Sequence, residues 1–330
     1  MKQKYSYGEA IRLGFEYLLD NYPDVFIIGQ GLWSPWYVGN SMTDLDKNYG
    51  TERIIDTPVS ESAVTGAAVG ASIVGMRPIV VHPRMDFMLY AMDSIVNQAA
   101  KWSQMFGGQS NAPVTIRGII NRGGEQGAQH SQALHTWFAH IPGLRVVMPS
   151  TVKDARDLLI SSVLSNDPVV FIDDRWLYDQ EEELEVVEEL DLNEQKPEIQ
   201  QIGTDITIVS LGYASKLARN SIEDLLGDGI SAELIDVRIL NPLEINVIVD
   251  SVKKTKNLLV IDPATKFCGY AAEIITGIME VIEPNEIQSK PVRISLPDAP
   301  APCSSTLEKD YYFNKSDIIE QVKLMLQKKI

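Results

Sequence analysis

Glu61 stands where a carboxyl group can either do acid–base chemistry or simply stabilise a helix. A strand-like segment gives way to a helical pattern there, and Ser60 is a reasonable N-cap. A glutamate in the first turn of a helix usually only complements the helix dipole. It shares a proton with a ligand only in a dry site, because burial raises the pKa of a carboxyl group. The residue by itself leaves both roles open.

Histidine and cysteine are the other side chains that titrate near neutral pH. The chain has four histidines, at positions 82, 130, 135 and 140, and two cysteines, Cys268 and Cys303. The cysteines form no CxxC motif and lack the spacing of zinc ligands or of a disulfide framework. We therefore expect reduced thiols and no metal site built by this chain.

The bulk properties limit the class of protein. With 330 residues, 45% of them hydrophobic and 22% charged, the chain is long enough for two ordinary folded domains. A net charge of −16 would repel nucleic acid and anionic membranes, so neither is expected as a partner. The N-terminus lacks the apolar core of a signal peptide, and the most apolar window, residues 62–81, contains Arg77 and Pro78. We expect a cytoplasmic protein.

The elements that must position these side chains alternate between strands and helices. Short apolar runs predict strands: VFIIG (25–29), RPIVV (77–81), VTIRG (114–118), RVVM (145–148) and PVVFI (168–172). Amphipathic stretches at residues 86–104 and 151–165 predict helices between them, so we expect a parallel sheet covered by helices. An acidic segment at 181–200 is expected to link a domain at 1–180 to a second βα series at 201–330.

One predicted helix is unusually poor in side chains. The segment SESAVTGAAVGASIVGM places Ala63, Gly66 and Gly70 three and four residues apart, so one helix face is nearly bare. Either another helix or subunit packs closely on this face, or the helix packs on its own sheet. The spacing does not choose between the two.

Several stretches together resemble the E1 β subunits of the pyruvate and branched-chain 2-oxo acid dehydrogenases, which belong to the transketolase-like thiamine-diphosphate enzymes. They occur in order over nearly the whole chain: RIIDTPVSES (53–62), GAAVGASIVGMRPIV (66–80), MDFMLYAMDSIVNQAAK (85–101), AQHSQ (128–132), WFAHIPGLRVVMPST (137–151), DPVVFID (167–173), IDVRILNPLE (235–244) and LPDAPAPCSSTLE (296–308). Matches in this order are more specific than any single motif.

The resemblance implies a fold and a partner. The expected fold is α/β: a pyrimidine-binding thiamine-diphosphate domain with a doubly wound parallel sheet, then a transketolase-type C-terminal α/β domain. An α-type subunit would hold the diphosphate and its magnesium, in an α2β2 heterotetramer. The GDG at 227–229 is followed by Asn257, but Asn257 precedes the strand LLVID instead of following one, so we interpret GDG as a helix-to-strand turn.

The resemblance also implies roles for individual residues. Glu61 would hydrogen-bond the cofactor's aminopyrimidine ring and so favour the tautomer that removes the thiazolium C2 proton. Phe87 would lie against that ring, with Val59 beside it. His130 would act on the 2-oxo acid or the reacting intermediate and is the best candidate among the histidines. His140 is expected to be a packing residue.

Departures from the family pattern fall around the expected pocket. Gln30 replaces a glutamate of a proton path between active sites, and an amide cannot relay a proton in the same way. Val81 replaces an acidic residue, and His82 and Arg84 interrupt a mostly apolar run beside the cofactor. Arg84 is either a salt-bridged surface residue or a ligand for an anionic substrate group.

Three functions stay open. The resemblance implies oxidative decarboxylation of a 2-oxo acid, with acyl transfer to the lipoyl groups of an E2 acyltransferase. The altered pocket also suits a two-subunit transketolase-like or carboligating enzyme of a specialised biosynthetic pathway, and the third alternative is a non-catalytic structural subunit. A potassium ion near Asp167 is an open alternative to which we do not commit.

Overall fold

The computed structural model describes residues 3–327 and divides into two compact units. Unit 1 contains the described residues up to Asn121, together with Trp137–Gln195 and Leu240–Pro242. Unit 2 contains Arg122–Thr136, Lys196–Ile239 and the described residues from Leu243 onward. The chain therefore enters unit 2 first over Arg122–Thr136, and after Lys196 it returns to unit 1 only over Leu240–Pro242. The expected domain boundaries at 180 and 201 stay a prediction.

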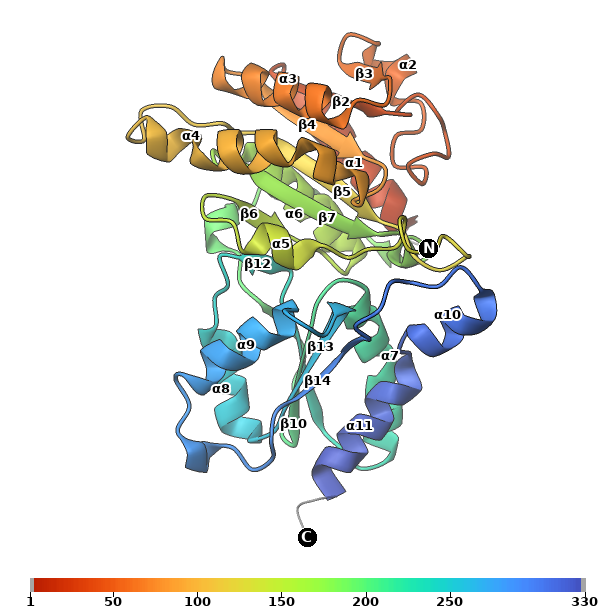
Figure 1. Cartoon of the computed structure of the whole chain (residues 1–330), viewed down its shortest axis with the longest axis vertical. Coiled ribbons are helices and arrows are strands. Elements are labelled where there is room, and N and C mark those ends of the chain that lie inside the picture. The colour runs from red at the N-terminus through yellow and green to blue at the C-terminus, as the bar shows by residue number, and fades with distance from the viewer. Residues whose placement is uncertain (1–2, 328–330) are drawn as a thin grey trace. The chain divides into compact units, whose positions relative to one another are not determined.

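Unit 1 is built on a seven-stranded sheet in the order β12-β6-β7-β5-β4-β2-β3 (Figure 1). Its strands are β2 (Val25–Gln30), β3 (Ile54–Thr57), β4 (Arg77–His82), β5 (Thr115–Ile120), β6 (Arg145–Val147), β7 (Val169–Asp174) and β12 (Ile239–Asn241). Strands β2 to β7 pair in parallel. Every residue of β5 and β7 is buried, as in a sheet covered on both faces. The five predicted strands are confirmed.

The helices of unit 1 follow the predicted alternation. They are α1 (Tyr7–Asn21), α2 (Leu45–Tyr49), α3 (Glu61–Ile73), η1 (Phe87–Ala91), η2 (Asp93–Ala99), α4 (Ala100–Met105), α5 (His135–Ala139), whose first two residues belong to unit 2, and α6 (Val152–Leu164). The single helix expected at residues 86–104 is instead a 3-10 turn, a π-helical segment and an α-helix. A Cβ on Gly66 would lie 3.3 Å from Ser94 Oγ, so α3 packs closely on this irregular segment within the chain.

Unit 2 has a five-stranded sheet in the order β14-β13-β10-β11-β9, with only β9 antiparallel. Its strands are β9 (Glu198–Gln201), β10 (Ile206–Ser210), β11 (Ala232–Asp236), β13 (Leu258–Thr265) and β14 (Val292–Leu296). The helices are α7 (Tyr213–Gly227), α8 (Asn246–Thr255), α9 (Tyr270–Met279), α10 (Ser305–Tyr311) and α11 (Lys315–Gln327), with a 3-10 turn η5 (Pro284–Glu286). Together the two sheets confirm the predicted α/β fold class.

The GDG segment is a turn, as predicted. Gly227 ends α7, Gly229 has a φ of +77°, and β11 begins three residues later at Ala232. Asn257 is buried and donates from Nδ2 to the carbonyl of Asp205 at 2.8 Å, so its amide serves the fold of unit 2. The diphosphate motif is therefore absent from the described part of this segment.

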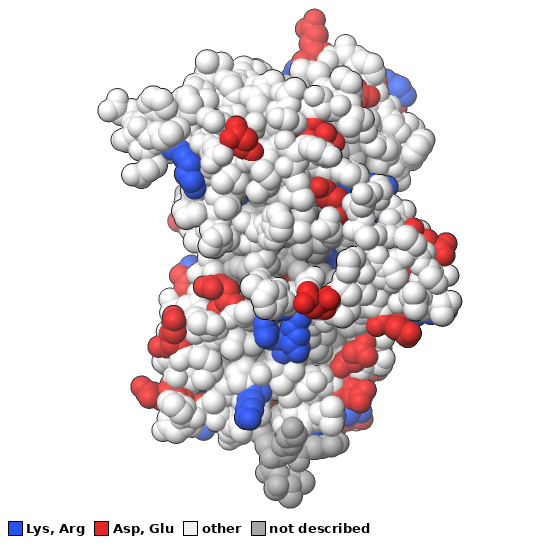
Figure 2. Space-filling view, in the orientation of Figure 1, with Lys and Arg blue, Asp and Glu red and all other residues white. Residues whose placement is uncertain are grey.

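The acidic segment expected to link the domains is ordered against unit 1. Strand β8 (Glu181–Glu183) pairs with β1 (Lys4–Ser6), and the hydroxyl of Tyr17 donates to Glu189 at 2.9 Å. Two 3-10 turns, η3 (Arg175–Leu177) and η4 (Leu192–Glu194), stand on either side of β8. Figure 2 shows acidic side chains spread over the visible face and fewer basic ones, as the net charge of −16 requires.

Candidate functional site

A concave site in unit 1 forms at the carboxyl ends of β2, β3 and β4. The carboxyl ends of parallel strands meet at one edge of a sheet, which is where α/β folds commonly bind ligands. The site is lined by residues from these strands and from the start of α3: Gly29, Gln30, Thr57, Pro58, Ser60, Glu61, Val64, Val81, His82 and Pro83. Two of the predicted site residues, Glu61 and His82, therefore share one concavity.

Glu61 is the first residue of α3, as the sequence predicted. Its side chain is partly buried and has no hydrogen-bond or ion-pair partner among residues 3–327. Ser60 occupies the N-cap position, as predicted, and its carbonyl accepts the N–H of Val64 at 3.0 Å, but its side chain makes no cap hydrogen bond. The carboxyl group at the helix start is thus left available to a ligand, and it lies at the positive end of the helix dipole.

Thr57 is a member of the site that the sequence did not reveal. Its Oγ1 is buried and has no partner in the part of the chain that the structure describes. A buried hydroxyl without a partner costs free energy, so this group in a concavity is a candidate contact for a ligand. It is the last residue of β3, four residues before Glu61, and that position at a strand end was the available signal.

Gly29 lets β2 and β4 approach closely beneath the site. A Cβ at this position would lie 2.3 Å from the carbonyl oxygen of Val81, its neighbour across the parallel pair. Next to it, Gln30 Nε2 donates to the hydroxyl of Tyr37 at 3.0 Å. The amide that replaces the expected glutamate is therefore held by a local hydrogen bond.

His82 is a buried imidazole at the end of β4. It is 3% exposed, and its Nε2 lies 3.2 Å from Thr65 Oγ1 on α3. Burial lowers the pKa of His82 to about 4, so the ring is neutral at pH 7. A neutral imidazole can hydrogen-bond through either nitrogen but carries no charge toward a substrate.

Three further predicted site residues are close in sequence to those that line the concavity: Val59, Arg84 and Phe87. Arg84 is partly buried and has no ion-pair partner in the described chain, so the expected alternative of a surface salt bridge is wrong. Phe87 is partly buried at the start of η1, where its N–H donates to the carbonyl of Arg84 at 3.2 Å. Val59 is 68% exposed, so its apolar side chain is accessible to a ligand.

His130 belongs to unit 2, in the segment Arg122–Thr136. It is partly buried, and its N–H donates to the carbonyl of Gly127 at 3.4 Å. Its proposed companions Glu61 and Phe87 belong to unit 1, so each unit carries its own part of the predicted set. His140, expected to be a packing residue, is exposed, so that prediction is wrong.

A second group that sequence reasoning missed is the pair His135 and Asp262. Both side chains are fully buried, and His135 Nε2 lies 3.0 Å from Asp262 Oδ1. Burial alone would raise the pKa of Asp262, but His135 and the N–H groups of Ala264 and Ala271 outweigh it, so the pKa lies below its usual value. The signal in the sequence was an acidic residue closing the apolar run LLVID.

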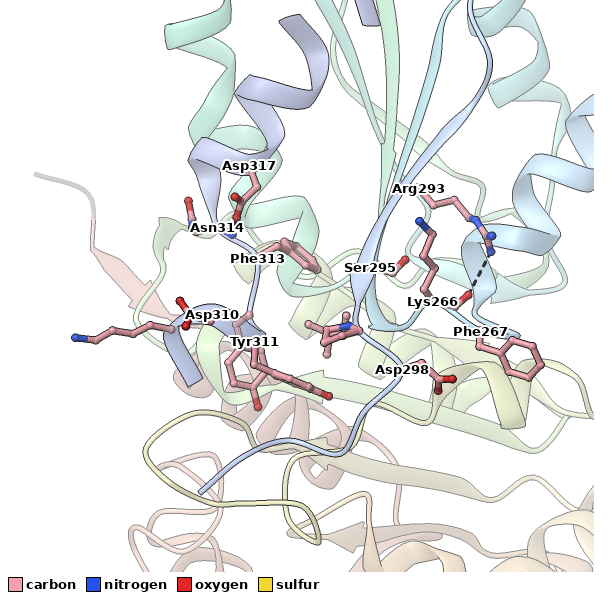
Figure 3. A pocket seen from close by; sticks show the side chains of 14 residues that line it. Lys266, Phe267, Arg293, Ser295, Asp298, Asp310, Tyr311, Phe313, Asn314 and Asp317 are labelled. Atoms are coloured by element: carbon pink, nitrogen blue, oxygen red, sulfur yellow. Dashed lines mark hydrogen bonds between the residues drawn. The ribbon is translucent and has the colours of Figure 1, made fainter. Parts of the chain in front are cut away.

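A larger cavity of about 870 Å³ lies in unit 2, between the ends of β13 and β14 and the start of α11. Figure 3 shows Lys266 and Arg293 on the strand side and Asp310, Asn314 and Asp317 on the helix side. Arg293 donates to the carbonyl of Lys266 at 3.2 Å. None of the predicted site residues lines this cavity.

The part of the chain that the structure describes, residues 3–327, holds no group of three or more His, Cys, Asp or Glu side chains able to bind a metal ion. It also has no helix whose length and apolar character would let it span a membrane.

Family models match both parts of the chain. Residues 3–180 match the transketolase pyrimidine-binding domain, and residues 195–318 match the transketolase C-terminal domain. A split-gene transketolase β4 tetramer has the same fold, with a TM-score of 0.76 at 19% identity and 98% coverage of each chain.

Curated relatives are similar over most of the chain. The pyruvate dehydrogenase E1 component subunit β of Rhizobium meliloti is 33% identical over 92% of this chain, which spans 66% of that protein's length. The corresponding subunit of Rickettsia felis is 34% identical, with 96% of each chain covered. The acetoin:2,6-dichlorophenolindophenol oxidoreductase subunit β of Cupriavidus necator is 36% identical, with 94% of each chain covered. The chain therefore belongs to the transketolase-like family of E1 β subunits, in which a pyrimidine-binding domain precedes a transketolase C-terminal domain.

Proposed function

We propose that this chain is the β subunit of a thiamine-diphosphate-dependent 2-oxo acid dehydrogenase, active with a separate α subunit. The observation that carries the proposal is the unpartnered Glu61 at the start of α3, in a concavity of the pyrimidine-binding domain. Relatives named pyruvate dehydrogenase E1 β subunits support pyruvate or a similar 2-oxo acid as substrate. The reaction would be oxidative decarboxylation, with the acyl group passed to the lipoyl groups of an E2 acyltransferase.

The residues present fit the aminopyrimidine end of the cofactor. That ring carries nitrogen acceptors and an amino donor, and the concavity offers a carboxyl group on Glu61 and an unsatisfied hydroxyl on Thr57. Val59 and Phe87 offer apolar surface for a planar ring. When bound, thiamine diphosphate supplies the carbon nucleophile that attacks the 2-oxo group.

This chain's own residues would then bind and move protons. Glu61 would hydrogen-bond the pyrimidine ring nitrogen and hold the proton shared with it, and the start of α3 would keep that carboxyl group in place. His130 would bind the substrate carboxylate or transfer a proton to the reacting group. Arg84, which has no acidic partner, would attract the anionic substrate, with neutral His82 lining the pocket.

The remaining components would come from other chains. The α subunit would hold the diphosphate and its magnesium, since the GDG of this chain is a turn, and the assembly would be an α2β2 heterotetramer. A potassium ion near Asp167 is not part of the proposal, because Asp167 already pairs with Arg145 at 2.7 Å. A cytoplasmic location is part of the same proposal.

The test is a complex reconstituted with an α-type E1 subunit. We expect 2-oxo acid-dependent reduction of an artificial acceptor, and a loss of at least about 100-fold in Glu61→Gln. The matched control Glu52→Gln removes an exposed carboxyl group in the same unit and should keep full activity. Turnover with neither pyruvate nor branched-chain 2-oxo acids would contradict the proposal.

A carboligating or transketolase-like reaction is the second candidate. Two observations favour it. The amide of Gln30, hydrogen-bonded to Tyr37, replaces an expected glutamate, and neutral His82 interrupts a run expected to be mostly apolar beside the cofactor. Product analysis separates the two reactions: the complex supplied with a 2-oxo acid and an aldehyde would release a ligated hydroxyketone without needing an electron acceptor. A non-catalytic structural subunit, the third alternative, would leave Glu61→Gln as active as the unmodified complex.

A further inference from the structure

The segment Arg122–Thr136 is a loop that leaves unit 1 and packs with unit 2. It carries His130 near its middle, and its two ends lie against the same short stretch of β13. A loop with high conformational freedom would place a histidine poorly, because each ordered residue costs conformational entropy. The contacts at its ends therefore decide where His130 lies.

The first contact is made by Arg122, which is 5% exposed. Its Nη1 donates to the carbonyl oxygen of Pro263 at 2.9 Å. A charged donor to a buried carbonyl makes a stronger hydrogen bond than a neutral one. The beginning of the loop is thus hydrogen-bonded to Pro263 of β13.

The second contact is the buried pair of His135 with Asp262, one residue earlier on the same strand. Asp262 Oδ1 also accepts the N–H of Ala264, and Oδ2 accepts the N–H of Ala271, both at 3.1 Å. Two backbone donors hold the carboxylate in one orientation, so the imidazole must present an Nε2–H to it. Nδ1 of His135 is buried and has no partner among the described residues. The carboxylate bond is therefore the polar contact that orients the ring.

The middle of the loop meets the segment before and within α10. Glu125 N–H donates to Glu308 Oε1 at 2.9 Å, and Glu125 Oε1 accepts the N–H of Ser305 at 3.2 Å. Gly127 has a φ of +70°, and a Cβ there would lie 2.5 Å from Cys303 Sγ. These contacts hold the loop on the N-terminal side of His130, and the His135–Asp262 pair holds it on the C-terminal side.

We propose that the His135–Asp262 pair is a positioning device that fixes this loop on unit 2 and thereby orients His130. The inference rests on the proposed function, since it needs His130 to act on the substrate. His135 and Asp262 themselves touch no reacting group and act through His130. Removing the imidazole N–H leaves the buried Asp262 carboxylate without one of its hydrogen-bond donors, which gives the substitution a large local effect.

The experiment compares variants of the assembled α and β complex by hydrogen exchange and kinetics. His135→Leu removes the N–H that donates to Asp262, whereas His135→Gln keeps an N–H donor. In Asp262→Asn the side-chain NH2 faces an N–H donor in either orientation of the amide. His140→Gln, an exposed histidine five residues away, is the control. We expect peptides covering 122–134 to exchange at least about tenfold faster in His135→Leu and Asp262→Asn, and near the unmodified rate in His135→Gln and the control.

Kinetics show whether the loosened loop matters to His130. We expect kcat to fall at least about tenfold in His135→Leu with a smaller change in KM, and to recover in His135→Gln. Exchange of the cofactor C2 proton, which depends on Glu61, should be unchanged. Unchanged exchange of peptides 122–134 in His135→Leu, or acceleration spread evenly over unit 2, would overturn the proposal.

The two proposals fail in different ways. If His130→Ala abolishes turnover while His135→Leu leaves it unchanged, the positioning role is wrong and the proposed function stands. If the loop loosens but neither His130→Ala nor His135→Leu changes turnover, the role assigned to His130 is wrong. The proposal that the His135–Asp262 pair orients a catalytic group is then wrong as well.

Discussion

At the scale of single residues, the site is defined by polar groups that the fold leaves without partners. Glu61 and Thr57 line one concavity, and neither side chain has a partner in the described chain. Their neighbour His82 is hydrogen-bonded to Thr65, and its ring is neutral at pH 7. The concavity thus offers a carboxyl group and a hydroxyl to a ligand, and an uncharged imidazole beside them.

Acid should destabilise the protein through His82. Its pKa is about 4 in the folded chain and 6.5 when exposed, so between these values the unfolded state binds more protons. The free energy of unfolding should therefore fall as the pH drops from 6.5 to 4, by up to about 3 kcal/mol. Denaturant melts of the unmodified chain and of His82→Gln across this range test it. The difference between the two curves should change between pH 6.5 and 4 and stay constant below pH 4, and parallel curves over the whole range would contradict the assignment.

Arg84 should govern substrate affinity. Replacing it by Gln removes an unpaired cation, so KM for the 2-oxo acid should rise about 10- to 100-fold while kcat changes less. Lys290→Gln, which removes an exposed charge in unit 2, is the control. Steady-state kinetics of the reconstituted complex give both constants, and an unchanged KM would remove Arg84 from the substrate pocket.

At the scale of elements, the carboxyl ends of β2, β3 and β4 and the start of α3 build the site. The close approach of β2 to β4 requires Gly29, and the close approach of α3 to η2 occurs at Gly66. Of the two open interpretations of the small-residue helix, Gly66 supports packing on a neighbouring helical segment, Ser94 of η2. Gly70 has nothing within 4 Å of an added Cβ.

These two glycines give a matched pair of substitutions. Gly29→Ala forces a Cβ to within 2.3 Å of the Val81 carbonyl, so it should lower the free energy of unfolding by about 1 to 3 kcal/mol. Gly70→Ala adds a methyl group in open space within α3 and should raise it by up to about 1 kcal/mol. Thermal or urea denaturation of the assembled complex measures both, and equal effects of the two substitutions would contradict the packing described.

At the scale of the whole molecule, the proposed function divides the active site between this chain and an α subunit. The GDG of this chain is a turn. Large apolar side chains are exposed in unit 1, among them Trp36 at 71% and Tyr90 at 73%. Exposed apolar surface of this kind is typical of a subunit that binds a partner.

The isolated chain should therefore not turn over substrate. We expect a homodimer or an unstable protein without activity, and turnover should appear when the α-type chain is added at equal concentration. Size-exclusion chromatography with light scattering, followed by acceptor-reduction assays across a titration of α chain, measures both. Activity of the chain alone would contradict the division of the cofactor site between subunits.

The sequence by itself determined the two α/β sheets, the place of Glu61 at the start of a helix and the membership of the E1 β family. Hydrophobic periodicity and strand propensity act over a few residues, so local patterns are enough to predict elements. The helix expected at residues 86–104 was less predictable, because its π-helical turns follow from packing against α3.

Only the tertiary structure decided which side chains meet and which are left unpaired. His135 and Asp262 lie 127 positions apart, so no local pattern joins them. The structure likewise left Thr57 without a partner and placed Arg122–Thr136 with unit 2. Such contacts depend on how the chain closes on itself, and their strength comes from burial, which a sequence does not state.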